Sequence, residues 1–102
     1  MTGRVRFTEA AETDVDEAVS WYAAKRPELS LAFLEAMNEV VDRIARAPLS
    51  FPARLDDVRQ ANMPKRWPYS SRFVVEPDES VVIAALHHRQ NQKTVQGRKP
   101  SP

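Results

Sequence analysis

The stretch that decides the fold is VVIAAL, Val81 to Leu86, near the end of a chain of 102 residues. Six consecutive apolar residues bounded by polar ones are typical of a strand that is buried on both faces. Such a strand lies in the middle of a sheet and needs a neighbour on each side. We predict this central strand over Val81–His88.

Two other segments are expected to supply these neighbours. Ser71–Glu76 precedes the central strand and is joined to it by a proline-containing turn. Arg4–Thr8 alternates between charged and apolar side chains, which predicts a short, half-buried strand. Val58–Met63 is half polar and is followed by a proline, so we interpret it as an edge strand.

A helical hairpin is predicted between the first strand and the others. Thr8 is a suitable N-cap for a helix over Glu9–Lys25, whose first turn carries acids. After Pro27, apolar residues three or four positions apart predict a longer helix that ends at Pro48. Because their connection is so short, the two helices should lie antiparallel. Pro48–Asp57 is predicted to be a loop.

The order of elements therefore predicts a two-layer α+β domain. An α-helical hairpin covers one face of the sheet, and the last three strands form an antiparallel meander. The domain is expected to span residues 1–98, with residues 99–102 as a disordered tail.

Composition excludes several classes of protein. The chain has no cysteine, and its only glycines are Gly3 and Gly97, so a disulfide framework, a thiolate metal site and a glycine-rich phosphate loop are all ruled out. We expect no cofactor and no metal. No segment has the apolar length of a membrane span or of a signal peptide, and we therefore expect a cytoplasmic protein.

Charge is distributed unevenly although the net charge is only +1. Up to Asp57 there are seven Lys and Arg against eleven Asp and Glu, whereas from Val58 onward there are eight against three. This asymmetry is consistent with chance and solvated helix faces. It is also consistent with a basic surface that meets an acidic partner or nucleic acid.

His87-His88-Arg89 is the most unusual local sequence. Because adjacent strand residues point to opposite faces, one histidine should face the helices and the other the open side of the sheet. Both histidines could be polar residues at a strand end. Alternatively, one could act as a general acid or base or bind phosphate.

Basic residues also flank an aromatic segment, Trp67-Pro68-Tyr69. Lys65, Arg66 and Arg72 surround it, and basic groups interleaved with aromatic rings can bind nucleic acid by charge and stacking. The alternative is that the rings fill the rim of the core. On the first predicted helix, Tyr22 is expected in the core and Trp21 at its partly exposed edge.

Several short segments together resemble ParE-like toxins of the RelE/ParE superfamily, often named plasmid stabilisation proteins. They occur in the family's order and spacing: Val5-Arg6-Phe7-Thr8-Glu9-Ala10-Ala11, Trp21-Tyr22, Phe33-Leu34, Ile44-Ala45-Arg46-Ala47-Pro48, Phe51-Pro52, Val58-Arg59, Trp67-Pro68-Tyr69 and Ala85-Leu86-His87-His88-Arg89. The resemblance covers nearly the whole chain and agrees with the predicted order of elements.

The resemblance implies a toxin that is neutralised by a ParD-like antitoxin, often with a ribbon-helix-helix DNA-binding half. ParE-like members bind DNA gyrase without known catalytic residues, whereas the similar RelE toxins cleave messenger RNA on the ribosome. If this chain is a nuclease, the candidate residues are Lys65, Arg66, Arg72, His87, His88, Arg89 and Arg98. Gln92 and Val95 replace a proline and a tryptophan found in many relatives, and no tyrosine follows Tyr69. These departures favour a toxin that acts by binding over an enzyme.

A third possibility is a non-toxic module that only binds antitoxin. In every case the antitoxin is expected to cover apolar surface on the helical hairpin and to add a strand at a sheet edge. The residues proposed for this contact are Trp21, Phe33, Met37, Val41, Ile44 and Met63.

Overall fold

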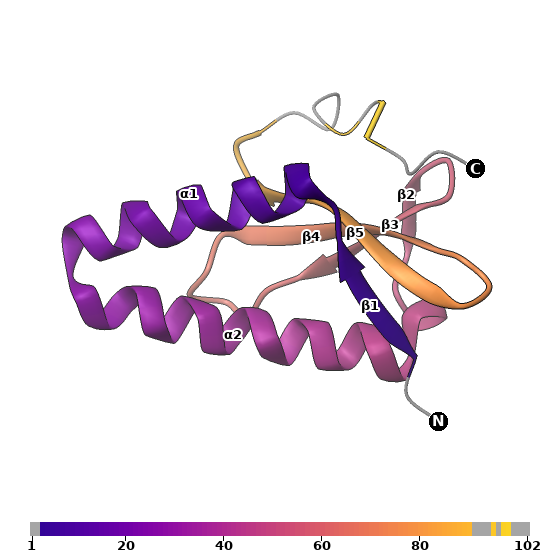
Figure 1. The fold of residues 1–102 in the computed structure, drawn as a ribbon, viewed down its shortest axis with the longest axis horizontal. Helices are drawn as coiled ribbons and strands as arrows, with labels where there is room; N and C mark the ends of the chain where they lie inside the picture. The colour runs from indigo at the N-terminus through magenta and orange to yellow at the C-terminus, as the bar shows by residue number, and fades with distance from the viewer. Residues whose placement is uncertain (1–2, 91–94, 96, 99–102) are drawn as a thin grey trace.

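The computed structural model describes residues 3–90, 95, 97 and 98, which fold as one sheet and two long helices (Figure 1). The elements in chain order are β1 (Arg4–Phe7), α1 (Glu9–Lys25), α2 (Pro27–Arg46), a 3-10 turn at Pro48–Ser50, β2 (Ala53–Leu55), β3 (Val58–Asn62), β4 (Tyr69–Val75) and β5 (Glu79–His87). The predicted α+β class and the helical hairpin are confirmed. The proposed tail at residues 99–102 lies outside the described residues.

The five strands form a mixed sheet in the order β1-β5-β4-β3-β2. β5 pairs with β4 in antiparallel fashion and with β1 in parallel, so both predicted neighbours of the central strand are confirmed. The parallel pair runs from Arg4 opposite Glu79 to Phe7 opposite Val82. Between these two parallel strands the chain forms the helical hairpin and then β2, β3 and β4, so the connection is longer than a parallel pair requires.

The segment Pro48–Asp57 corrects the prediction of a plain loop. It contains a 3-10 turn and the short strand β2, which pairs with Arg59 and Val58 of β3. The sequence suggested that β3 is the outermost strand, but β2 lies outside it. The missed strand is only three residues long and mostly exposed, so no alternation of apolar residues announces it. Asp56 makes the tight turn into β3 with a positive φ of 52°, which Asp tolerates better than most residues.

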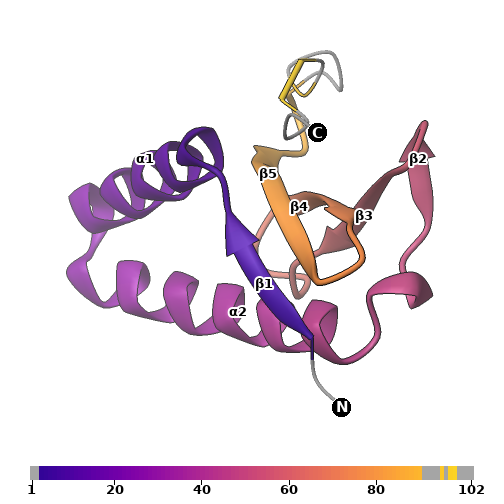
Figure 2. The same cartoon turned by 45° about the vertical axis from the view of Figure 1, so that its right-hand side comes forward.

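Both helix starts follow from local chemistry. The Thr8 Oγ1 accepts a hydrogen bond of 3.2 Å from the Ala11 amide, and acids occupy the first turn of α1. Pro27 opens α2, where its missing amide hydrogen is not needed. Together the two helices cover one face of the sheet (Figure 2). Within the described residues, no helix has both the length and the apolar character needed to span a bilayer.

The sheet has a hydrophobic cluster on each face. The cluster beneath the helices contains Phe33, Val40, Ile44, Phe73 and Val82, all fully buried. The cluster on the opposite face is smaller and is also buried; it consists of Val58, Val74, Val81, Ile83, Ala84, Leu86 and Val95. Val95 comes from the segment that follows β5. Val95 therefore contributes a buried side chain to the far face of the sheet.

Candidate functional site

Six aromatic rings gather where α1 and α2 meet the ends of β4 and β5. Tyr22 is at the centre: its ring centroid lies 5.4 Å from that of Phe33 and 4.9 Å from that of Trp67. Tyr69 joins the cluster, and its ring lies 5.1 Å from that of His87. The expectation that Trp67 and Tyr69 contribute to the core is confirmed. These ring contacts hold Tyr22 and Tyr69 in place at the surface beside α1 and β5.

Trp21 is the member of this cluster that reaches solvent. Its side chain is 56% exposed, while its ring packs edge-on against Tyr22 at 5.0 Å. The Lys25 ammonium lies 4.9 Å from the centre of the Trp21 ring. The expected division between a packed Tyr22 and a partly exposed Trp21 is therefore confirmed. An exposed tryptophan held in one position is well suited to contact a partner.

A groove of about 510 Å³ opens beside this aromatic cluster, and we call it the α1–β5 groove. Its lining comes from α1, from the segment before β4 and from the end of β5: Asp14, Glu17, Ala18, Trp21, Tyr22, Pro68, Tyr69, Ala85, His87, Arg89 and Gln90. Acids lie on the helix side and Arg89 lies on the strand side. The groove thus combines an aromatic floor with walls of opposite charge.

The two tyrosines in the groove are neutral groups at physiological pH. Burial raises the pKa of Tyr22 above its usual value of 10.0. Burial also raises the pKa of Tyr69, and the nearby Tyr22 adds to that effect. Neither phenol is therefore prepared to act as a base near neutral pH. Their rings pack against their aromatic neighbours and form part of the groove lining.

The structure separates His87 from His88. His87 ends β5 and lines the groove on the helix side, where its Nδ1 accepts a hydrogen bond of 3.1 Å from the Arg89 amide. A neutral His87 ring therefore carries its hydrogen on Nε2. His88 lies beyond the strand in an exposed turn and donates its backbone amide to Pro68 at 2.8 Å. Because β5 stops at His87, the predicted strand was one residue too long, and the alternation argument does not extend to His88.

The basic candidates are spread over different parts of the fold. Arg72 on β4 is buried, and its Nε donates to the Ser70 hydroxyl at 3.2 Å. Burial lowers the pKa of Arg72, and the nearby Arg54 lowers it further. Since Phe73, the next residue along β4, packs beneath the helices, Arg72 faces the opposite side of the sheet. It is therefore separated by the sheet from His87.

The other basic candidates lie in the loop before β4, at the mouth of the groove and beside Asp14. Lys65 and Arg66 are exposed in the loop before β4, where the Arg66 guanidinium lies 4.8 Å from the centre of the Trp67 ring. Arg89 is exposed at the mouth of the α1–β5 groove. Arg98 forms an ion pair with Asp14, with 2.6 Å between Nη1 and Oδ2. Of the seven candidates, only His87 and Arg89 share the groove.

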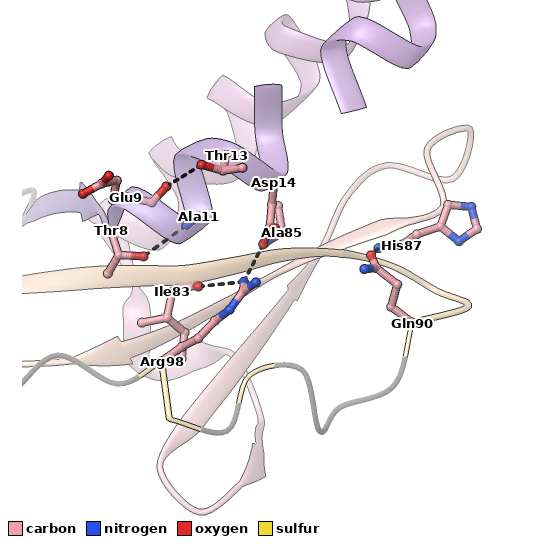
Figure 3. A network of polar contacts seen from close by, with 10 residues as sticks. All are labelled: Thr8, Glu9, Ala11, Thr13, Asp14, Ile83, Ala85, His87, Gln90 and Arg98. Atoms are coloured by element: carbon pink, nitrogen blue, oxygen red, sulfur yellow. Dashed lines mark hydrogen bonds and ion pairs between the residues drawn. The ribbon is translucent and has the colours of Figure 1, made fainter. Parts of the chain in front are cut away.

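The edge of β5 beside the groove has an unusual set of partners (Figure 3). β1 pairs with β5 only as far as Val82. Beyond that point the Ala85 amide donates to Asp14 Oδ2 at 3.0 Å, and Arg98 donates to the Ile83 carbonyl at 3.3 Å. The His87 amide donates to Gln90 Oε1 at 2.8 Å. Side chains therefore occupy backbone groups that a neighbouring strand would otherwise bind.

Sequence reasoning missed Asp14, Glu17 and Gln90. Asp14 had a detectable signal: it lies three residues after Ala11 and four before Ala18, both of which are buried, so an acid occurs on the inward side of α1. Glu17 and Gln90 are exposed polar residues with no comparable signal. No group of three or more His, Cys, Asp or Glu suited to a metal ion occurs among the described residues.

These features can now be compared with known proteins. The family described as the ParE toxin of the type II toxin–antitoxin system parDE matches residues 5–92. This chain belongs to the ParE toxin family. No curated protein matches the sequence.

Two solved structures share the fold of this ParE-family chain. One belongs to the chromosomal ParDE toxin–antitoxin system from P. aeruginosa; the TM-score is 0.74 at 22% identity, covering 84% of this chain and 96% of that one. The other belongs to the toxin–antitoxin complex RelBE2 from Mycobacterium tuberculosis; the TM-score is 0.58 at 20% identity, covering 85% and 99%. At these identities the likeness shows the RelE/ParE fold.

Proposed function

We propose that this ParE-family toxin acts by binding DNA gyrase and is neutralised by a cognate antitoxin. The observation that carries the proposal is the family match over residues 5–92, which includes both helices and all five strands except Arg4, the first residue of β1. Both similar solved structures are described as toxin–antitoxin systems, which supports an antitoxin as partner.

The distribution of the basic residues also favours binding over RNA cleavage. A nuclease of this size needs an acid, a base and cations close to one phosphate. Here Arg72 and His87 lie on opposite faces of the sheet, and Arg98 is engaged by Asp14. The side chains proposed for cleavage therefore do not converge on one site in this conformation.

The antitoxin is proposed to bind exposed apolar side chains on the helical hairpin. Four of the six residues named from the sequence, Phe33, Met37, Ile44 and Met63, are buried in the core, because most of the α2 stripe faces the sheet. Trp21 and Val41 retain exposed surface, and Leu31 and Leu34 are exposed by 64% and 37%. We propose that these four side chains form the contact.

The gyrase proposal is tested with the purified toxin, DNA gyrase and plasmid DNA. We expect inhibited supercoiling and an accumulation of cleaved plasmid, and we expect the antitoxin to reverse both effects. The same toxin preparation added to topoisomerase I is the control for non-specific binding to DNA. Normal supercoiling together with uncleaved plasmid would contradict the proposal.

The nuclease alternative makes a different prediction. We expect the triple variant His87→Ala, His88→Ala and Arg72→Ala to remain toxic in cells, provided that circular dichroism shows it to be folded. Transcript cleavage in a translating extract, lost in the variant, would establish the nuclease instead. Normal growth of cells that express the wild-type chain without antitoxin would identify a non-toxic antitoxin-binding module.

A further inference from the structure

Among the described residues, no strand lies beside one edge of the second half of β5, and this edge opens into the α1–β5 groove. Within the described part of the chain, β1 covers the edge only up to Val82, whereas β5 continues to His87. Ala85 and His87, two residues of this edge, line the groove. A sheet edge of this kind is a template for pairing with an extended segment of another chain.

The side-chain hydrogen bonds at this edge can be replaced by hydrogen bonds to the backbone of a partner chain. Asp14, Gln90 and Arg98 bind the Ala85 amide, the His87 amide and the Ile83 carbonyl through their side chains. A partner backbone offers the same carbonyl and amide groups, so each of these bonds has a replacement of equal kind. The edge can therefore change partners without leaving a buried polar group unsatisfied.

The helix wall of the groove indicates the charge of the incoming segment. Glu17 lies one turn after Asp14, and among the described residues its side chain makes no ion pair or hydrogen bond. When a partner carbonyl takes the Ala85 amide, Asp14 Oδ2 also loses one of its two hydrogen bonds. Two carboxylates on one helix wall then favour a Lys or Arg side chain.

We propose that an extended segment of the antitoxin pairs with Ile83–His87 in line with β1 and places a basic side chain against Glu17 and Asp14. This inference rests on the proposed antitoxin partner and deepens it. The segment takes the place of three side-chain bonds, and its side chain on the helix side enters the α1–β5 groove. Arg98 keeps its ion pair with Asp14, and only its hydrogen bond to the Ile83 carbonyl is replaced.

The first test is residue-resolved amide exchange of the labelled toxin, alone and in complex with its cognate antitoxin. We expect exchange of the Ala85 and His87 amides to slow by about tenfold or more in the complex, because backbone pairing replaces bonds to mobile side chains. The Phe73 amide in the buried strand β4 is the internal control and should change far less. A stable complex in which Ala85 and His87 exchange as in the free toxin would overturn this inference and leave the proposed antitoxin partner intact.

The second test concerns charge. We expect Glu17→Lys to weaken antitoxin binding by about tenfold at low salt and less at high salt, because it places a like charge against the basic side chain. Asp78→Lys is the matched control, since Asp78 is an exposed acid in the turn between β4 and β5, outside the groove, and it should stay within about twofold. Equal effects of both variants would overturn the proposed contact between a basic antitoxin side chain and Glu17. Absence of any complex with the wild-type toxin would overturn the antitoxin partner and this inference together.

Discussion

The two halves of β5 are both largely buried but have different neighbours. Glu79–Val82 lies between β1 and β4, whereas Ile83–His87 has β4 on one edge and side chains on the other. Val82 and Ile83 are nonetheless both fully buried, one beneath the helices and one on the far face. The comparison shows that burial of both faces of a strand does not require pairing of both edges.

Each half of β5 has an ion pair beside it, and the two pairs make different contacts with the strand. In the first half, Arg6 Nε lies 3.0 Å from Glu79 Oε2, and both side chains point to the surface. In the second half, Arg98 and Asp14 pair at 2.6 Å and also bind the Ile83 carbonyl and the Ala85 amide. The Arg98–Asp14 pair therefore supplies hydrogen bonds that a neighbouring strand would otherwise make. The Arg6–Glu79 pair only joins two side chains of strands that are already paired.

The largest expected effect tests whether the second half is packed as firmly as the first. Ile83→Ala should lower the free energy of unfolding by about 2–5 kcal/mol, because it leaves a cavity in the far-face cluster. Urea denaturation followed by circular dichroism measures this loss. The control is Val75→Ala, a partly exposed site on β4, with an expected change within about 0.5 kcal/mol. A loss below about 1 kcal/mol at Ile83 would mean that the second half is loosely packed.

A smaller effect is expected from the polar network of the second half. Asp14→Ala should cost about 1–3 kcal/mol of unfolding free energy, because it removes the acceptor of the Ala85 amide together with the ion pair to Arg98. Asp14→Asn keeps an acceptor oxygen and should cost less. Urea denaturation gives both values, and amide exchange at Ala85 gives the local effect. If Asp14→Asn costs as much as Asp14→Ala, the ion pair and not the amide bond supports this edge.

The sequence was sufficient to predict the arrangement around β5. The apolar run from Val81 to Leu86 placed it centrally, and the turn before it and the alternation in Arg4–Thr8 identified both neighbours. The α2 stripe predicted a helix that ends at Pro48, and α2 stops two residues earlier, at Arg46. These features are visible because periodic burial leaves a periodic pattern in the sequence.

What the sequence did not show depends on contacts between distant residues. β2 forms because the chain returns to β3 after a tight turn at Asp56, and three exposed residues carry no pattern of their own. Asp14 and Arg98 are 84 positions apart, so their pairing cannot be read from spacing. The α2 stripe predicted apolar side chains correctly, but it could not tell which of them face the sheet and which remain exposed to a partner.

The smallest expected effect concerns the ion pair of the first half. Glu79→Gln should change the free energy of unfolding by about 0.2–1 kcal/mol, because the Arg6 side chain is 47% exposed and solvent screens the attraction. Urea denaturation at low and high salt measures it, and the small difference should disappear at high salt. Glu28→Gln, which breaks the more exposed pair with Arg26, should have an effect no larger than that of Glu79→Gln. A salt-independent loss at Glu79 comparable to that of Asp14→Ala would contradict the comparison, since the first half would then depend on its ion pair as much as the second half does.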